Sequence, residues 1–371
     1  MELLMKGIYK VVLFLILMLS FGVRFAYTQS TPDDFCDFNF PRQNGSGGIH
    51  VTQEDGIYTL FTNPAIFAEL KRKWYISSII ASRSFSPNIS ASNAVIATDL
   101  YGPLFFAFTN ENFAVGIFNN TRVKFDRVND SYRFGEQLFV TTGYGGNVYE
   151  TENHTISLGV QLKTDFFAVA VEKPSGTAQS EFEDVKIMTS DNTPIEFDTE
   201  IGIDVGFLYD YKNFIRFGLS IRDLYTIVIH TDYASYNDMK KGSGGTTVQP
   251  WKFPNMSIGL SVAPPIPAHY RTFTGYIFWV ELNDIINASI EAMTGPPHTL
   301  PFAYDFAFGM EFEFNKAYKL RLGFKELAPT VGIGIEMGNF DVDGSFAIVQ
   351  FSGTPYTNIG LQVGVSFTAK L

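Results

Sequence analysis

Residues 302–314 have the sequence FAYDFAFGMEFEF, and their apolar and small or polar side chains alternate without a break. The first set is Phe302, Tyr304, Phe306, Phe308, Met310, Phe312 and Phe314. The positions between them carry Ala, Asp, Gly and Glu. A period of two places the two sets on opposite faces of a β-strand. The stretch therefore predicts a strand with one apolar and one polar face, on which Phe308 points outward and Gly309 inward.

The same alternation recurs along the chain. Residues 318–325, 201–209, 215–221 and 359–371 repeat it. We expect fourteen strands, which begin near Trp74, Ala94, Phe113, Gln137, His154, Thr199, Phe214, Pro254, Arg271, Pro301, Ala317, Thr330, Phe340 and Thr357.

A soluble β-sandwich has the same period of two, with one face buried. Two features favour a lipid environment instead. The apolar faces extend over about ten residues, as in a tilted strand that crosses a bilayer, and many begin or end on Phe or Tyr. The polar faces are rich in Gly and Ser, which suits a crowded lumen. The predicted fold class is therefore all-β, a transmembrane antiparallel barrel of about 14 strands with an N-terminal plug.

The predicted connections differ in length on the two sides of the barrel. If the C-terminus is periplasmic, the periplasmic connections are short: 110–112, 146–153, 211–213, 263–270, 315–316 and 338–339. The opposite side has the long ones: 121–136, 173–198, 226–251 and 283–299. This asymmetry is typical of bacterial outer-membrane barrels.

The N-terminus predicts export. Lys6 and Lys10 precede an apolar run over residues 11–19, and small or polar residues follow, as in a cleaved signal peptide. The lone cysteine, Cys36, excludes an intramolecular disulfide. The net charge of −11 argues against nucleic acid as a partner. We expect a signal peptide at 1–30, a hatch or plug segment at 31–70 and a barrel at 71–371.

The hatch segment contains apolar residues that are unfavourable in water, Ile57, Leu60, Phe61, Ile66 and Phe67. A segment folded inside the barrel would bury them, whereas a disordered leader would not. Asn63 and Pro64 predict a turn near the end of this segment.

A resemblance to a known family follows from this order of elements. A signal peptide, a short N-terminal segment, the motif Asn63-Pro64-Ala65 and about fourteen strands resemble the FadL-like outer-membrane transporters of hydrophobic compounds and the related PorV-type barrels. Ile66 follows the motif where the family typically has Gly, and the chain ends on Leu371 where Phe is common. The resemblance implies a monomeric barrel that is blocked by its hatch, contacts outer-membrane lipid, and depends on the barrel-assembly machinery through its C-terminal strand.

The polar positions of the strands are expected to face the lumen. They are Asp204, Arg216, Arg222, Asp305, Glu311, Glu313, Lys319, Arg321, Lys325 and Glu336, with Asp341 and Asp343 beside them. These side chains could pair with one another and hold the plug, or they could form a polar wall along which a substrate moves. Glu311 and Glu313 face Lys319 and Arg321 on the adjacent predicted strand, which favours pairing.

The sequence shows no catalytic constellation and implies no cofactor or metal. The five histidines are scattered, and His230 with Asp232 is the one acid/base pair to consider. The function expected from the resemblance is passive transport of small hydrophobic molecules that resemble long-chain fatty acids, rather than an enzymatic activity. A PorV-like protein-binding barrel for secretion or surface attachment and a structural barrel or adhesin are the alternatives. Apolar residues in the predicted outer loops, such as Tyr233, Tyr236 and Met239, could capture a ligand, contact a protein or pack on each other.

Overall fold

A computed structural model describes residues 40–54, 56–86, 95–126, 131–172, 194–249, 254–266, 272–286, 288–289, 305–325, 328–350 and 359–371. The predicted signal peptide lies outside the described residues. The strands are β1 Lys73–Ser86, β2 Val95–Asn110, β3 Phe113–Asp126, β4 Ser131–Glu150, β5 His154–Glu172, β6 Ile195–Tyr211, β7 Ile215–Tyr233, β8 Gly245–Gln249, β9 Asn255–Val262, β10 Phe273–Leu282, β11 Phe306–Phe314, β12 Tyr318–Lys325, β13 Ala328–Met337, β14 Phe340–Gln350 and β15 Ile359–Lys370.

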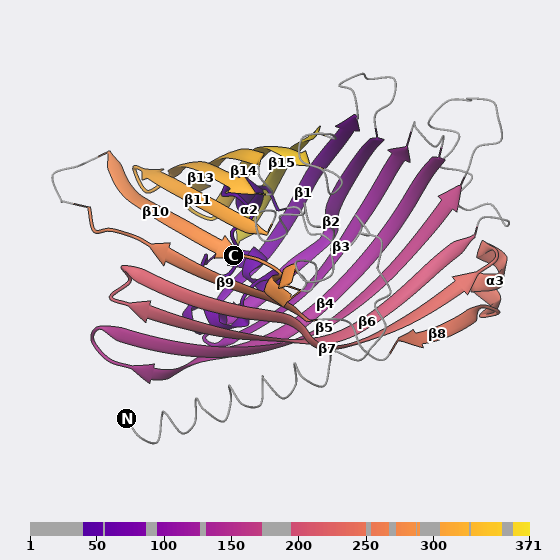
Figure 1. Ribbon diagram of the computed structural model, residues 1–371, viewed down its shortest axis with the longest axis horizontal. Coiled ribbons are helices and arrows are strands. Elements are labelled where there is room, and N and C mark those ends of the chain that lie inside the picture. Colours follow the sequence, from indigo (N-terminus) through magenta and orange to yellow (C-terminus); the bar gives the residue numbers. More distant parts are fainter. Residues whose placement is uncertain are drawn as a thin grey trace. The chain divides into compact units, whose positions relative to one another are not determined.

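Fourteen of these strands form a closed antiparallel ring. Sequential neighbours pair with each other, β1 pairs with β15, and β7 pairs with both β6 and β9. Strand β8 pairs only with the outer part of β7 and is not part of the ring. Figure 1 shows β8 and the short helix α3 (Tyr236–Lys241) beyond the ends of the neighbouring barrel strands. The ring leaves no unpaired edge, which confirms the predicted all-β antiparallel barrel of 14 strands.

Tight turns join several strands where the sequence predicted short connections. Lys212 with Asn213 and Asn315 with Lys316 have φ between +52° and +57°. Two successive residues with positive φ are typical of a type I′ hairpin turn, whose twist matches that of the flanking strands. Gly338 also has a positive φ, between β13 and β14. These turns fix the register of the hairpins.

The alternation in the sequence corresponds to the two faces of the wall. In β15, Leu361, Val363 and Phe367 are each about half exposed, whereas Gln362 and Ser366 are buried. A barrel whose exposed face is apolar and whose buried face is polar has the polarity of a membrane-spanning barrel. No helix in the described part of the chain has the length and hydropathy needed to cross a membrane.

The segment of residues 40–70, called here the N-terminal segment, contains three short helical elements. They are α2 (Pro41–Gly45) and the 3-10 helices η1 (Gly56–Phe61) and η2 (Pro64–Glu69). α2 contacts β12–β15, whereas η2 contacts β4–β6 on the other side of the ring. All five apolar residues that the sequence placed in the hatch are buried. The segment contacts the face of the wall that is turned away from the exposed apolar side chains.

Three predicted boundaries were wrong. The connection predicted over residues 121–136 is much shorter, because β3 continues to Asp126 and β4 begins at Ser131. The strand predicted over residues 302–314 begins at Phe306 in the structure, after a bend at Asp305. The connection predicted over residues 226–251 is not one long loop, because β7 continues to Tyr233 and α3 and β8 follow. Asp238 accepts at its carboxylate from the Ser235 hydroxyl, and Gly242 ends α3 in the left-handed conformation, which stabilises this local structure.

Candidate functional site

Asn63 joins the N-terminal segment to the barrel wall. Its side-chain oxygen accepts from the backbone N–H of Ala65 at 3.0 Å and so caps η2. Its amide nitrogen donates to the carbonyl of Val51 at 2.9 Å and to that of Phe207 in β6 at 3.1 Å. The side chain is fully buried. Three of its hydrogen-bonding positions are therefore satisfied by two parts of the segment and one strand.

A row of glycines in the wall receives the Asn63-Pro64-Ala65 motif. Gly145 in β4, Gly159 in β5 and Gly206 in β6 are directly paired across their strands. A Cβ on Gly145 would lie 2.5 Å from the Pro64 carbonyl oxygen, and one on Gly159 or Gly206 would overlap the motif outright. Only glycine allows the two backbones to approach this closely. The row is a docking site built into the strands.

Two further glycine pairs receive other parts of the segment. Gly218 and Gly259 face each other across β7 and β9, and a Cβ on Gly218 would lie 2.8 Å from the Val51 side chain. Gly309 and Gly323, paired across β11 and β12, receive the Ser46–Gly47 turn. A Cβ on Gly309 would overlap the Ser46 carbonyl, so replacing this inward-facing glycine by a larger residue should destabilise the folded barrel.

Glu281 of β10 binds the middle of the segment through backbone groups. Its carboxylate accepts from the N–H of His50 at 2.9 Å, of Val51 at 2.8 Å and of Thr52 at 3.4 Å. The His50 ring Nδ1 lies 3.4 Å from the same carboxylate and 3.0 Å from the carbonyl of Gly48. Glu281 is 1% exposed, and sequence reasoning did not identify it.

The environment of His50 favours its neutral form. Burial and, to a smaller extent, the nearby positive charges of Arg222 and Lys325 together lower the pKa of His50 from 6.5 to about 3, against a backbone hydrogen bond to Gly48 that raises it. At neutral pH the imidazole is therefore uncharged, and Nδ1 donates to the Gly48 carbonyl. The His50 side chain therefore brings no charge to the contact between the N-terminal segment and Glu281.

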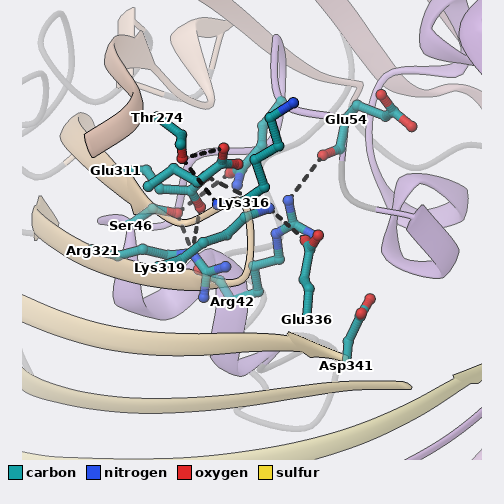
Figure 2. Close-up of polar contacts among 12 residues, drawn as sticks. Arg42, Ser46, Glu54, Thr274, Glu311, Lys316, Lys319, Arg321, Glu336 and Asp341 are labelled. Carbon is teal, nitrogen blue, oxygen red and sulfur yellow. Dashed lines mark hydrogen bonds and ion pairs between the residues drawn. The ribbon is translucent and has the colours of Figure 1, made fainter. Parts of the chain in front are cut away.

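A charged network lies under α2. Arg321, which is 1% exposed, donates to Glu311 at 2.7 Å and to Asp343 at 2.6 Å. Lys319 donates to Glu336 and lies 3.8 Å from Glu311. Figure 2 shows Glu311, Lys319, Arg321 and Glu336 grouped beside Arg42 of α2. Arg42 donates to the carbonyl of Glu54 at 3.4 Å. The network links the four strands β11, β12, β13 and β14 and lies next to the N-terminal segment.

The remaining predicted lumen residues fall in several places. Asp204 accepts from Lys163, which also pairs with Asp223. Arg216 pairs with Asp210 in its own hairpin and with Glu69 at 2.9 Å at the end of η2. The half-buried members are Arg222, Asp305, Glu313, Lys325 and Glu336. The sequence analysis did not single out Lys163, Asp223 or Glu69. Lys163 and Glu69 could have been found as charges that complement the predicted lumen residues Asp204 and Arg216.

An aromatic cluster occupies another part of the inner wall. It consists of Phe40, Tyr58 and Phe61 of the N-terminal segment and Phe105, Phe118 and Phe139 of β2, β3 and β4. All six side chains are at most 9% exposed. An apolar cluster is unusual on an inner wall that is otherwise charged or hydroxylated, and composition alone did not locate it.

The wall is irregular beside this cluster. Between Tyr101 and Phe105, β2 contains two more residues than the matching part of β3, and its register with β1 shifts in the same place. This interval includes Pro103, which has no N–H to donate to a neighbouring strand. The ladder of hydrogen bonds is therefore interrupted at the edge of the aromatic cluster.

Comparison with solved structures identifies the fold. The toluene transporter TbuX of Ralstonia pickettii superimposes with a TM-score of 0.52 and 14% identity, over 89% of this chain and 97% of that one. The fold is that of a FadL-like outer-membrane barrel. The monoaromatic hydrocarbon channel CymD (13% identity, TM-score 0.48, 89% of this chain and 96% of that one) and a FadL homologue of Pseudomonas aeruginosa (10%, 0.44, 89% and 97%) also match. No model of a known protein family and no curated protein matches the sequence.

The FadL-like barrel fold supports the outer membrane as the location of the chain. His230, considered as an acid/base residue, is held between Asp198 and Asp232 at the outer ends of β6 and β7. In the described part of the chain, no group of His, Cys, Asp and Glu is arranged to hold a metal ion.

Proposed function

We propose that the chain is a passive outer-membrane channel for small hydrophobic molecules and that the N-terminal segment is its hatch. The observation that carries this proposal is the aromatic cluster on the inner wall. A water-filled porin lumen has a polar wall, whereas here part of the inner wall carries aromatic rings that pack against the N-terminal segment. A hydrophobic solute needs an apolar surface to leave the water phase, and the cluster supplies one.

We further infer that the solute leaves through the irregular part of β2. The interrupted register at residues 101–105 adjoins Phe105, the first ring of the cluster on that strand. A hydrophobic molecule that passed sideways into the bilayer would avoid the aqueous periplasm. The names of TbuX and CymD, which include toluene and monoaromatic hydrocarbons, support a hydrophobic solute but do not extend to long-chain fatty acids.

The hatch proposal rests on the way in which the segment is held. Asn63, Glu281 and the glycine rows hold its backbone at several points, and α2 and η2 contact different sides of the ring. A PorV-like protein-binding role would instead need a partner surface. No observation on the described residues favours that alternative.

Substituting Asn63 by Ala tests the proposal. The change removes hydrogen bonds to Val51, Ala65 and Phe207, at about 1–3 kcal/mol for the buried groups left without partners. We expect the barrel to fold and the rate of uptake of a hydrophobic fluorescent tracer into proteoliposomes to change at least threefold. Asn147→Ala, which removes side-chain hydrogen bonds to Glu150 and Ser157 within the β4–β5 hairpin, is the control. No tracer uptake by the wild-type protein above protein-free liposomes would refute the channel, and unchanged uptake by the Asn63 variant would refute the role of the motif.

A further inference from the structure

His154 and Tyr209 form a polar pair on the outward face of the wall, at the short-turn ends of β5 and β6. Alternation turns both outward, because Ser157 and Leu208 on the opposite face are at most 2% exposed. His154 Nδ1 lies 2.9 Å from the Tyr209 hydroxyl oxygen. If the hydroxyl donates, the imidazole keeps a proton on Nε2, and if Nδ1 donates, the hydroxyl keeps its own proton. In both tautomers one proton is left, and no other group in the described part of the chain accepts it.

Lys212 places a positive charge beside this pair. Its ammonium lies 5.4 Å from the centre of the Tyr211 ring, and that ring lies 5.1 Å from the His154 ring. The backbone of Lys212 is fixed, because its N–H donates to the carbonyl of Asn153 in the neighbouring turn at 3.0 Å. Among the described residues Lys212 forms no ion pair. Its charge is therefore available to an anionic ligand.

An apolar surface continues along the same strands from the polar pair towards the middle of the wall. On β5 the outward side chains of Leu158, Val160 and Leu162 are each about half exposed. On β6 the Phe207 ring contacts the ring of Phe217 in β7 at 6.4 Å. This surface belongs to the lipid-facing belt of the barrel, so the molecule that meets Lys212 and His154 there is a lipid. A phospholipid has the matching order of groups, with a phosphate at the interface and acyl chains in the hydrocarbon.

A carboxylate next to Lys212 narrows the choice of headgroup. Glu152 is exposed in the turn between β4 and β5, one residue before Asn153. Glu150 of the same hairpin accepts from Asn147 at 3.0 Å, whereas Glu152 has no ion pair within the described residues. A carboxylate repels a phosphate unless the headgroup also carries a cation. In phosphoethanolamine a short ethylene linker separates the ammonium from the phosphate, so that one headgroup can meet both Glu152 and Lys212.

We propose that this cluster binds phosphatidylethanolamine in the leaflet on the short-turn side of the barrel, which is the periplasmic side in outer-membrane barrels. The phosphate accepts from Lys212 and from the His154–Tyr209 pair, and the ammonium meets Glu152. The inference goes beyond the channel function and does not depend on it, because the site faces lipid rather than the lumen. β5 and β6 also carry part of the glycine row that receives the Asn63-Pro64-Ala65 motif. A lipid bound here holds the ends of the strands to which the hatch docks.

Native mass spectrometry of the full folded chain in detergent micelles tests the site, with dioleoyl phosphatidylethanolamine as the probe. Lys212→Asn removes the charge, and Asn accepts the φ of +57° at this position. We expect the substitution to weaken binding at least fivefold. Lys316→Asn makes the same change in the turn between β11 and β12, where φ is +55°, and should bind like the wild type. If Lys212→Asn does not fold, His154→Phe keeps a ring but removes both nitrogens and should also weaken binding at least fivefold.

Two other lipids separate the headgroup from the acyl chains. Dioleoylglycerol, which lacks the phosphate, should bind the wild type at least fivefold more weakly than the probe. Dioleoyl phosphatidylglycerol, which lacks the amine, should bind at least threefold more weakly, and Glu152→Gln should remove that difference.

Unchanged binding of the probe by Lys212→Asn would overturn the inference, as would an equal loss in Lys316→Asn. Equal binding of dioleoylglycerol and the probe would show contact with the apolar belt alone. Equal binding of the two phospholipids by the wild type would refute the zwitterionic headgroup. Displacement of the probe by excess inorganic phosphate would refute the lipid, because it would reveal a site for a free anion.

Discussion

Single atoms decide whether the N-terminal segment can lie against the wall. At Gly206 an added Cβ would overlap the Asn63 side-chain oxygen, and at Gly159 it would overlap the Pro64 carbonyl. These positions are inward-facing places in strands, where most residue types would otherwise be accepted. The space is occupied by the chain itself, so the constraint comes from a segment more than 90 residues away in the sequence.

We expect Gly206→Ala to destabilise the folded barrel by about 1–3 kcal/mol, because the new methyl group overpacks the wall against Asn63. Chemical unfolding in detergent, followed by the heat-dependent gel shift, measures the change. Gly344→Ala is a matched control on β14, because the nearest atom to its new methyl group lies 3.4 Å away, at ordinary contact distance. A similar loss of stability in the two variants would contradict the docking role of Gly206.

The pKa of His50 predicts a loss of stability in acid. Burial and nearby positive charges lower this pKa from 6.5 to about 3, so between these pH values the unfolded chain binds a proton on His50 while the folded chain does not. The contribution is fully present above pH 6.5 and is lost as the pH falls towards 3, by at most tenfold in the unfolding equilibrium per pH unit. His50→Gln should remove this part of the pH dependence. Parallel unfolding curves of the variant and the wild type from pH 7 to pH 4 would contradict the prediction.

Sequence reasoning found some of the site residues and missed others for physical reasons. Asn63, Pro64 and Ala65 form a compact motif, so a resemblance could point to them. Glu281 binds backbone N–H groups that lie 229 to 231 residues away, and backbone groups leave no signal in the sequence. The aromatic cluster was missed because Phe is abundant on both faces of this barrel, and alternation alone does not distinguish the few rings that face inward.

At the scale of the strands, alternation was a sufficient guide. Each predicted strand start lies within six residues of the observed one, and the expected faces of β15 agree with its burial. The errors lie at the outer ends, where β7 continues beyond the ring and β8 pairs with it. Outside the bilayer no lipid enforces the alternation, so the sequence has no periodic signal there.

A charge on the outward face should destabilise the barrel according to its depth. Phe308 lies six residues before Phe314, the last residue of β11 ahead of the β11–β12 turn, whereas Phe340 lies beside the β13–β14 turn. We expect Phe308→Arg to destabilise the folded state by about 2–4 kcal/mol and Phe340→Arg by about 0–1 kcal/mol. Refolding into lipid vesicles at increasing urea concentrations measures both. Equal effects at the two positions would contradict the assigned orientation of β11.

The buried network of β11, β12 and β14 should behave as one unit. Arg321→Met leaves Glu311 and Asp343 buried without their cation, and we expect a loss of about 3–5 kcal/mol. Adding Glu311→Gln and Asp343→Asn to the same chain removes the unpaired charges and should recover at least half of that loss. Urea unfolding of the single and triple variants gives the comparison. A triple variant that is less stable than Arg321→Met alone would show that the three side chains are solvated independently.

For the whole molecule, the number of strands and the asymmetry of the connections could be predicted, because both follow from patterns that are local in the sequence. The ring closes because the count of fourteen is even, so that β1 meets β15 in antiparallel orientation. The path of the N-terminal segment could not be predicted. It depends on which inward residues are glycines that pair across strands, and pairing between distant strands requires the register.

Deleting residues 45–60 from the folded barrel should open the lumen. The deletion removes the Ser46–Gly47 turn, the groups bound by Glu281, and most of η1. We expect the conductance in planar bilayers to rise at least severalfold and small polar solutes to pass. Deleting Tyr236–Lys241, a helix at the outer end of β7, is the control and should leave the conductance near that of the wild type. Unchanged conductance after the first deletion would contradict the hatch.

The paired glycines of the wall also bear on how the barrel is made. η2 contacts β4–β6, and α2 contacts β12–β15, so the segment touches strands on both sides of the seam between β1 and β15. Where paired glycines face the lumen, the strands have no side chains of their own to fill the space beside them. We therefore expect the segment to act as a template during assembly: it enters before the last pair of strands joins, and the seam closes around contents that are already in position.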